Sequence, residues 1–389
     1  MKGTVIRMSD NKMNLDEIRA KIDEKDNELL EVFLERMKLA AEVAKYKQEN
    51  DLPILNKTRE RDILASVAAK SGDLGLYAHR FFSSAIEISK AYQGELLAHS
   101  SDLIKLIEDS KLPGDTVFPK SGTVACQGVE GAYAQAVADK IFPRGTLMYF
   151  NTFEAIFNAV ENGLCQYGIL PIENSSNGSV REVYELLSEK DVYIIKNEKI
   201  CVRHELLAKP GTKLSDITEI YSHEQAIGQC RRFLKEIGSN VKVIPVANTA
   251  MAAKMVSEAD GNHVASISSH ECGILYGLEP ISTKIQDSEN NYTRFICISK
   301  TPQIYPGANK ISLILTTAHK PGALYEVLAK ISALEINLIK LESCPIPGHD
   351  FEFIFFIDLE ASVNDTGVTS MLAELQSSCD MFKYLGNYS

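Results

Sequence analysis

The chain has 389 residues, of which 45% are hydrophobic and 24% are charged, so it is long enough for two or three globular domains with real cores. Its formal net charge of −11 argues against a nucleic-acid or anionic-membrane partner. The first residues are polar and no apolar run approaches about 18 residues, so we expect a cytoplasmic protein without a signal peptide or membrane span.

Helical periodicity dominates the first part of the chain, from about residue 14 to residue 105. Asn14 followed by Glu17 predicts a capping box at the start of a first helix, which continues for over thirty residues until Leu52-Pro53 interrupts it. Further helices are expected over 57–70 and 77–99. Because one long helix is not stable without a partner surface, this pattern favours a dimer with paired long helices.

Polar side chains interrupt the apolar faces of these helices. Arg36 and Lys47 are 11 residues apart and therefore share one face of the first helix. Glu60 on the second helix, and Ser89 with Gln93 on the third, also lie on apolar stripes. Buried polar groups cost free energy unless they are paired, so several of them on facing stripes indicate a lined cavity. Each cation taken singly also fits an ordinary surface position.

The helical segment resembles the all-helical chorismate mutases through L15-D-E-I-R19, L34-E-R36, K45-Y-K47, R59-E60-R61-D62, I86-E-I-S89 and Q93. By that resemblance Arg36, Arg59 and the partner chain's Arg19 hold the two carboxylates of the substrate, since the guanidinium fork binds carboxylate in bidentate fashion. The reaction is a rearrangement without a nucleophile, so conformational restraint and electrostatics carry the catalysis.

The same resemblance assigns the polar residues of the predicted cavity. Lys47 and Gln93 donate to the ether oxygen, where charge grows as the C–O bond breaks. Glu60 binds the substrate hydroxyl and Ser89 a carboxylate. Asn56 is a departure, because the family often has Asp there; Asn still accepts a hydrogen bond, so we expect retained activity with altered substrate contacts. The alternative, a mutase segment kept only for regulation or assembly, conflicts with the presence of the other site residues.

The middle of the chain changes pattern after a linker over 113–122. Short β-rich runs alternate with helical stretches, which predicts βαβ units and a mainly parallel sheet, with strands at 123–126, 167–170, 219–221, 241–246 and 295–298. The eight cysteines stand singly with no C-x-x-C pair, and the sequence holds no metal-ligand constellation and no nucleotide-binding glycine fingerprint. We therefore expect reduced thiols, no metal and no cofactor.

Four polar clusters stand near the expected strand ends, where open α/β sheets build their sites. They are C126-Q-G-V-E-G131, L170-P-I-E-N-S-S-N-G-S179, Y221-S-H-E-Q225 and N290-N-Y-T-R-F295. The first alone is a weak signal, because a G-x-x-G is more often a plain turn than an anion site. In this order they resemble the prephenate dehydratases over roughly residues 122–300. That resemblance implies a two-lobed fold like the type 2 periplasmic binding proteins, with substrate in the cleft.

The dehydratase resemblance also implies a proton donor. It assigns Thr293 to protonate the departing hydroxyl while carbon dioxide leaves and the ring becomes aromatic. A Thr hydroxyl is a weak acid and needs polarising neighbours, for which Glu173 and Asn174 are the candidates. Arg294 would pair with a carboxylate of the substrate.

The remaining motif residues would contact other polar groups of the substrate. Ser175, Ser222 and Gln225 are expected to bind them, whereas His223 fits a structural role equally well. Ala134 replaces the Ser usually found in the first motif, so one hydrogen bond is expected to be missing or supplied by the backbone.

The last segment, from residue 310 onward, follows the order strand, helix, strand, strand, helix, strand, which predicts a ferredoxin-like unit. It resembles the ACT regulatory domains through K320-P-G-A-L-Y325 and L341-E-S-C-P345. That resemblance implies a phenylalanine site between paired domains, formed by Gly322, Ala323, Leu324, Glu342 and Ser343. Cys344 stands where the family has Arg, which removes a fixed charge and predicts weakened affinity. A dimerising domain without a ligand is the alternative.

Together these features predict a bifunctional enzyme of phenylalanine biosynthesis with an all-α mutase domain over 10–105, an α/β dehydratase domain over 122–300 and an α+β ACT domain over 308–389. Its expected partners are chorismate, prephenate, the effector phenylalanine and at least one further copy of the chain. A solute-binding protein with the same two-lobed fold is the non-catalytic alternative. Arogenate is the alternative dehydratase substrate, but a fused mutase favours prephenate because it supplies that compound directly.

Overall fold

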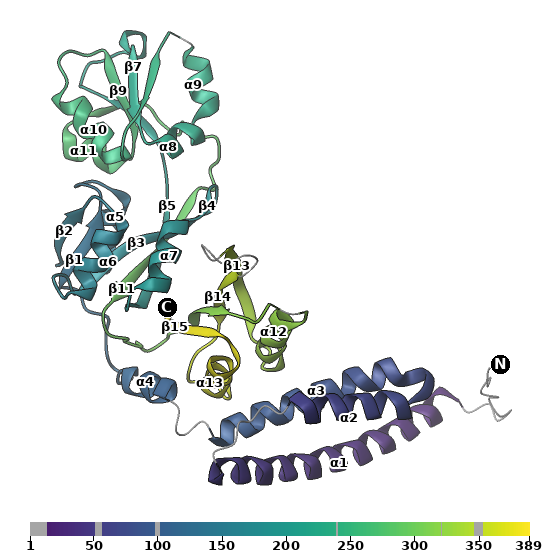
Figure 1. The fold of residues 1–389 in the computed structure, drawn as a ribbon. Coiled ribbons are helices and arrows are strands. Elements are labelled where there is room, and N and C mark those ends of the chain that lie inside the picture. Colours follow the sequence, from purple (N-terminus) through teal and green to yellow (C-terminus); the bar gives the residue numbers. More distant parts are fainter. Residues whose placement is uncertain (1–13, 51–56, 98–101, 239, 320, 346–352) are drawn as a thin grey trace. The chain divides into compact units, whose positions relative to one another are not determined.

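The computed structural model describes residues 14–50, 57–97, 102–238, 240–319, 321–345 and 353–389, and Figure 1 shows its fold with many of the elements labelled. The chain divides into two compact units, Met1–Ile104 with Ser370–Glu374, and Lys105–Thr369 with Leu375–Ser389. Among the described residues, no helix has the length and apolar character needed to cross a membrane.

The first unit consists of three long helices, α1 (Leu15–Glu49), α2 (Lys57–Lys70) and α3 (Gly75–Leu97). These confirm the predicted helices. The capping box also forms, since the Asn14 amide donates to Glu17 Oε2 over 3.2 Å and the Glu17 amide to Asn14 Oδ1 over 2.9 Å. Helix α3 packs against both α1 and α2.

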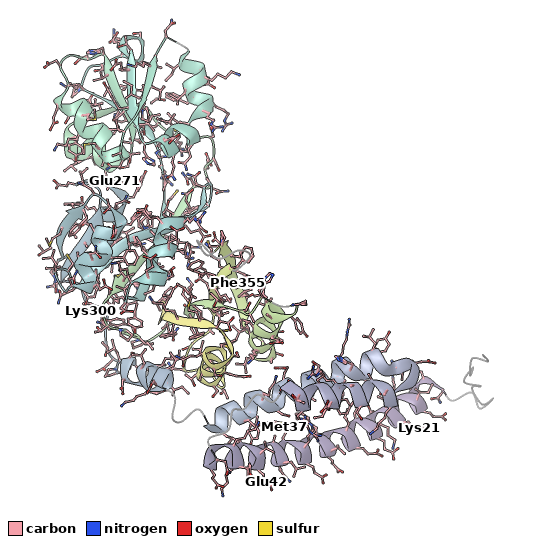
Figure 2. The ribbon with its side chains drawn as sticks, viewed as in Figure 1. Lys21, Met37, Glu42, Glu271, Lys300 and Phe355 are labelled. Carbon is pink, nitrogen blue, oxygen red and sulfur yellow. The ribbon has the colours of Figure 1, made fainter. Side chains whose placement is uncertain are left out.

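The helical unit leaves much of its apolar surface in contact with solvent. Charged residues such as Lys21 and Glu42 project from α1 (Figure 2), but large apolar side chains do so as well. Between 46% and 68% of the surface is exposed for Leu15, Ile22, Leu29, Leu30, Val32, Leu39, Tyr77 and Phe81. One chain therefore does not bury the apolar faces that its own helices present.

The second unit begins with helix α4 (Asp102–Ser110), of which residues 105–110 belong to it, and a first α/β lobe. The sheet of this lobe has the order β2-β1-β3-β11-β5, with β4 paired to β3. Its strands are β1 (Thr123–Gln127), β2 (Thr146–Phe150), β3 (Tyr167–Asn174), β4 (Gly178–Ser179), β5 (Tyr193–Cys201) and β11 (Tyr292–Ser299). The helices of the lobe are α5 (Tyr133–Ile141), α6 (Phe153–Glu161) and α7 (Arg181–Glu189).

A second α/β lobe is inserted between β5 and β11, with strand order β10-β6-β9-β7-β8. Its strands are β6 (Glu205–Ala208), β7 (Glu219–Ser222), β8 (Lys242–Pro245), β9 (Val264–Ser268) and β10 (Glu279–Ser282). Its helices are α8 (Glu224–Gln229), α9 (Arg231–Ile237), α10 (Thr249–Glu258) and α11 (His270–Tyr276).

Both of these sheets are mixed, so the prediction of a mainly parallel sheet is wrong. Strands β1, β2 and β3 are parallel, but β11 is antiparallel to both β3 and β5. The physical reason is the path of the chain, because β11 returns from the second lobe and enters the first sheet without a crossover helix. In the second lobe β7 is parallel to β8 and β9, whereas β6 is antiparallel to both of its neighbours, β9 and β10.

The C-terminal segment has the predicted order of elements and an antiparallel sheet β13-β14-β12-β15. The elements are β12 (Lys310–Thr316), α12 (Ala323–Ala333), β13 (Asn337–Pro345), β14 (Phe353–Glu360), α13 (Val368–Ser378) and β15 (Met381–Tyr388). This strand order is that of the ferredoxin-like fold.

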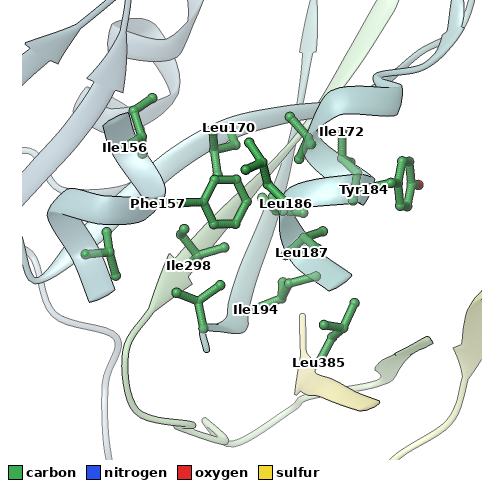
Figure 3. Packing of buried hydrophobic residues seen from close by; sticks show 14 of the residues in the cluster. Ile156, Phe157, Leu170, Ile172, Tyr184, Leu186, Leu187, Ile194, Ile298 and Leu385 are labelled. Atoms are coloured by element: carbon green, nitrogen blue, oxygen red, sulfur yellow. The ribbon is translucent and has the colours of Figure 1, made fainter. Parts of the chain in front are cut away.

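The C-terminal sheet shares a hydrophobic core with the first lobe. Phe157 and Leu187 of the lobe belong to one buried cluster with Leu385 of β15, as Figure 3 shows. The two backbones meet at Gly386, where an added Cβ would clash with the carbonyl of Ile194, so only glycine fits this close approach. The C-terminal sheet and the first lobe therefore form one packed body.

Candidate active sites

The predicted polar residues of the helical unit meet along the seam between α1 and α3. Arg36 donates from Nη1 to the carbonyl of Ala85 over 3.0 Å and also to the hydroxyl of Ser89. Lys47 donates from Nζ to Gln93 Oε1 over 3.3 Å. Ser89 and Gln93 are both buried, so this seam carries polar groups where an ordinary helix pair has apolar ones.

Glu60 of α2 belongs to the same site. Burial lowers the pKa of Lys47 below its usual value, with the charge of Glu60 acting in the opposite direction. Glu60 also pairs with Lys90 of α3 at 3.3 Å, and Lys90 pairs with Glu87 at 2.6 Å. Sequence reasoning missed Lys90; its place beside Ser89 was the available signal.

Three further residues predicted for this site lie elsewhere or outside the described residues. Arg19 pairs with Asp16 at 3.5 Å on an exposed part of α1, more than four helical turns before Arg36. Arg59 is exposed near the start of α2. Asn56 lies outside the described residues.

A cavity of about 510 Å³ opens between the two α/β lobes. Asn174, Thr293 and Ala134 line it from the first lobe, and Gln225 and Gln229 line it from the second. The Ala134 departure therefore lies in the wall of this cavity. No group of three or more His, Cys, Asp or Glu side chains able to hold a metal occurs among the described residues.

Thr293 and Asn174 are joined inside the cavity. Asn174 Nδ2 donates to Thr293 Oγ1 over 2.9 Å, while Asn174 Oδ1 accepts from the backbone amides of Ser176 and Asn177 over 2.9 and 3.0 Å. Thr293 therefore accepts a hydrogen bond from Asn174, and among the described residues no acceptor is found for its own hydroxyl hydrogen. A hydrogen bond donated to the hydroxyl oxygen is of the kind that polarises its O–H bond.

Glu173 and Arg294 do not line the cavity, which corrects the roles expected for them. Side chains alternate along a strand, so the neighbours of Asn174 and Thr293 face the other side of the sheet. There Arg294 Nη2 lies 3.0 Å from Glu173 and 2.7 Å from Asp358 of β14, and Lys340 of β13 lies 3.5 Å from Glu173. Burial acts to raise the pKa of Glu173, but the charges of Lys340 and Arg294 lower it below its usual value.

Ser175 and Ser222 were also expected to contact the substrate, but their hydroxyl groups bind the backbone instead. Ser222 is fully buried and donates to the carbonyl of Ile267 over 2.7 Å, which ties β7 to β9. Ser175 donates to the carbonyl of Asn290 and accepts from the Tyr292 amide, each over 2.9 Å, which secures the entry into β11. Both hydroxyls hold backbone in place.

His223 and Gln225 begin helix α8. His223 is its N-cap residue, since its Nδ1 accepts from the Gln225 amide over 3.3 Å, which gives the imidazole a structural role. Both side chains line the cavity, and the side-chain amide of Gln225 can donate into it.

Three polar residues of this region were missed by sequence reasoning. Gln229 lies four residues after Gln225 on α8, and Asn291 stands inside the N-N-Y-T-R-F run, so each had a signal. His204 had none, because an isolated His in a sequence is most often a core residue. Gln229 and His204 line the cavity, and Asn291 joins them to Asn174 through hydrogen bonds.

The predicted regulatory residues occupy two places in the C-terminal segment. Gly322 is the N-cap of α12 with φ +87°, and Ala323 and Leu324 form the first turn of that helix. On β13, Ser343 is exposed, whereas Glu342 accepts from Lys340 Nζ over 3.0 Å and from the hydroxyl of Ser179. Since Ser179 lines the cavity, a contact connects β13 to the cavity wall.

Comparison with known proteins gives matches along nearly the whole chain. A chorismate mutase type II family profile matches residues 18–94, and a prephenate dehydratase profile matches residues 124–303. The bifunctional chorismate mutase/prephenate dehydratase of Escherichia coli K12 is 31% identical over 95% of both chains. An arogenate dehydratase/prephenate dehydratase of Arabidopsis thaliana is 32% identical over 78% of this chain and 81% of its own. A solved structure of prephenate dehydratase from Arthrobacter aurescens in complex with L-Phe is 28% identical with a TM-score of 0.63, covering 69% of this chain and 89% of that chain.

Proposed function

The chain belongs to the family of bifunctional chorismate mutase/prephenate dehydratases, and on this premise we propose which residues perform each of its steps. It rearranges chorismate to prephenate and converts prephenate to phenylpyruvate. We assign the mutase to residues 10–105, the dehydratase to 122–300 and a phenylalanine-binding ACT domain to 308–389. The observation that carries the dehydratase assignment is the buried Thr293 hydroxyl in the cavity between the lobes, with Asn174 donating to it.

In the mutase, Lys47 and Gln93 donate to the ether oxygen of chorismate. Arg36 and Ser89 bind a carboxylate, Arg59 supplies a further cation, and Glu60 accepts from the substrate hydroxyl. The hydrogen bonds that pair Arg36 with Ser89 and Lys47 with Gln93 support this assignment, because they hold the four groups side by side before substrate arrives.

The mutase site is completed by a second copy of the chain, which supplies Arg19. Two observations support a homodimer: Arg19 lies away from Arg36 and Lys47 in its own chain, and the helices expose large apolar side chains such as Leu29 and Leu39. An isolated helix as long as α1 gains most of its stability from packing, which a second helical unit would supply.

Mixing two inactive variants tests this arrangement. Arg19→Ala and Lys47→Ala should each lose mutase activity as homodimers. Refolded together, they form heterodimers in which one of the two sites keeps both Lys47 and the partner's Arg19, so activity should return. A mixture that stays inactive while heterodimers are demonstrably present would contradict a shared site.

In the dehydratase, Thr293 donates its hydroxyl proton to the departing hydroxyl of prephenate, which leaves as water. The electron pair of the bond to the ring carboxylate moves into the ring, carbon dioxide leaves and the ring becomes aromatic. The hydrogen bond from Asn174 stabilises the charge that develops on Thr293 Oγ1, and solvent returns the proton afterwards. Gln225 donates to a polar group of the substrate from the opposite lobe.

The C-terminal domain binds phenylalanine and restrains the dehydratase. The amides that follow Gly322 at the start of α12 are suited to the carboxylate of an amino acid, and Glu342 and Ser343 complete the site across the paired domain. The complex of the Arthrobacter aurescens relative with L-Phe supports this assignment. The contacts of Glu342 with Ser179 and of Asp358 with Arg294 offer a path from this site to the dehydratase strands.

Calorimetry with phenylalanine, followed by dehydratase rates in its presence, tests the regulatory assignment. Binding together with a fall in phenylpyruvate formation is expected. Absence of both at millimolar phenylalanine would leave a dimerising domain without a ligand.

A further inference from the structure

Three polar side chains connect Thr293 to a buried histidine. Asn174 Nδ2 donates to Thr293 Oγ1 over 2.9 Å and to Asn291 Oδ1 over 2.8 Å. Asn291 Nδ2 donates to Gln229 Oε1 over 2.9 Å, and His204 Nε2 lies 2.9 Å from the same oxygen. The chain of hydrogen bonds runs from the first lobe, through the return crossover, to helix α8 of the second lobe.

The donor and acceptor of every hydrogen bond in this series follow from one fixed group, the side-chain oxygen of Asn174. Two backbone amides, of Ser176 and Asn177, donate to Asn174, and an amide hydrogen can only donate, so the atom they meet is the oxygen of Asn174. The nitrogen of Asn174 must then face Asn291, which must present its oxygen and turn its own nitrogen to Gln229.

The orientation of Asn174 also determines the last hydrogen bond of the series, between Gln229 and His204. Gln229 meets the Asn291 nitrogen with its oxygen, and therefore His204 must carry a hydrogen on Nε2 and donate it to the same oxygen. Two donors thus occupy Gln229 Oε1. Its NH2 group has no acceptor among the described residues and remains for the cavity that Gln229 lines.

His204 lies where the chain crosses between the lobes. It stands between β5 and β6, its amide donates to Gln286 Oε1 over 3.1 Å, and its carbonyl accepts from the Ile285 amide. Only 2% of its surface is exposed, and burial lowers the pKa of His204, so the imidazole is neutral at neutral pH. Its Nδ1 has no hydrogen-bond partner in the described part of the chain, so nothing there favours moving the hydrogen from Nε2 to Nδ1.

We propose that His204 is a positioning residue of the dehydratase, which holds Gln229 so that the NH2 group of Gln229 faces the cavity as a hydrogen-bond donor to the substrate. The group it serves is a carboxylate or keto oxygen, since the NH2 group can only donate. The inference rests on the proposed dehydratase site, and it adds that His204 acts there through Gln229. Without His204, Asn291 alone would hold the Gln229 oxygen, so the Gln229 amide would turn more readily and bring its oxygen to the cavity, where it repels those oxygens.

A double-mutant cycle on kcat/KM for prephenate tests this proposal, with mutase activity measured on the same preparations. His204→Leu and Gln229→Leu should each lower kcat/KM by about tenfold or more, the effect of one lost hydrogen bond in a reacting complex. In the Gln229→Leu background, His204→Leu should cost less than about twofold, because its action runs through Gln229. Losses that multiply would overturn the proposal, since a merely structural histidine acts independently of Gln229.

A conservative variant covers the case in which His204→Leu does not fold. Glutamine places its Nε2 close to the position of the histidine Nε2 and also donates, so His204→Gln should keep kcat/KM within about threefold of the parent protein. His204→Asn is the matched control, because its shorter side chain does not reach Gln229, and it should resemble His204→Leu. Equal loss in His204→Gln and His204→Asn would overturn the proposal. Unchanged turnover in Gln229→Leu would overturn the assigned cavity as well, whereas unchanged turnover in His204→Leu alone would overturn only the role of His204.

Discussion

Arg294 of β11 donates to Asp358 of β14 over 2.7 Å, and both side chains are less than 10% exposed. Arg294 directly follows Thr293, so the strand that carries the proposed proton donor on one face is bound on its other face by the C-terminal sheet. Burial disfavours the charge on Arg294, but Asp358 raises its pKa above the usual value. The ion pair therefore links the C-terminal sheet directly to β11.

Removing Asp358 should destabilise the second unit strongly. Asp358→Ala leaves Arg294 buried with Glu173 as its remaining carboxylate and should lower the free energy of unfolding by about 3–5 kcal/mol, measured by urea titration. Lys254→Ala is the control, because it removes a solvent-exposed pair with Glu258 and should cost less than about 1 kcal/mol. Equal effects of the two substitutions would mean that the buried pair contributes no more than a surface one.

Changing Asn174 to Asp should remove dehydratase activity without disturbing the turn. The carboxylate still accepts from the amides of Ser176 and Asn177, but it no longer donates to Thr293 or Asn291. It instead accepts the Thr293 hydroxyl hydrogen, which turns the donor away from the substrate. We expect kcat to fall by roughly a hundredfold or more, within the usual range for a lost acid catalyst. Activity above a tenth of the parent value would exclude this role for Asn174.

Sequence patterns predicted the helices well because helical periodicity is local. Residues 57–70 form α2 with the expected bounds, and the Asn14–Glu17 capping box is present. The mixed sheets were not predictable in the same way, because β11 meets β3 from more than a hundred residues away and its direction depends on the inserted lobe.

The sequence motifs predicted which segments form the candidate site, but not which of two neighbouring side chains faces the cavity. Thr293 and Arg294 are neighbours in one motif, as are Asn174 and Glu173, and which member faces the cavity depends on the strand alternation. Strand alternation alone allows either member of each pair to face the cavity. Arg294 and Glu173 face the C-terminal sheet because their charged partners lie there. His204 has no motif around it, and its role follows only from its hydrogen bonds.

The mutase should lose activity at alkaline pH earlier than an ordinary lysine titration predicts. In the proposed mechanism the positive charge of protonated Lys47 stabilises the ether oxygen. Burial lowers the pKa of Lys47, so the charge is present at low pH and is lost as the pH rises through that lowered value. As the pH is raised, the rate of prephenate formation should therefore begin to fall before pH 10.5, the usual pKa of lysine, is reached. In Lys47→Arg, whatever activity remains should persist to higher pH, because Arg keeps its proton above pH 12.

Restoring an arginine at position 344 should strengthen the response to phenylalanine. Cys344 lies on β13 next to Ser343, and the thiol provides no fixed charge for the effector. We expect Cys344→Arg to lower the phenylalanine concentration for half-inhibition of the dehydratase by about tenfold, the value of one charged hydrogen bond. Cys344→Met, of similar length but uncharged, is the control and should leave the inhibition curve unchanged. An identical curve for all three proteins would remove position 344 from the effector site.

The most direct test of the whole account is product analysis over time after incubation with chorismate alone, for the parent protein and for Thr293→Ala. The parent protein should form prephenate and then phenylpyruvate, whereas Thr293→Ala should accumulate prephenate at the parent rate and form at most about a hundredth of the phenylpyruvate. Phenylpyruvate formed by Thr293→Ala at a near-parent rate would contradict the assignment of the proton donor, and persistence of chorismate with the parent protein would contradict the bifunctional activity itself.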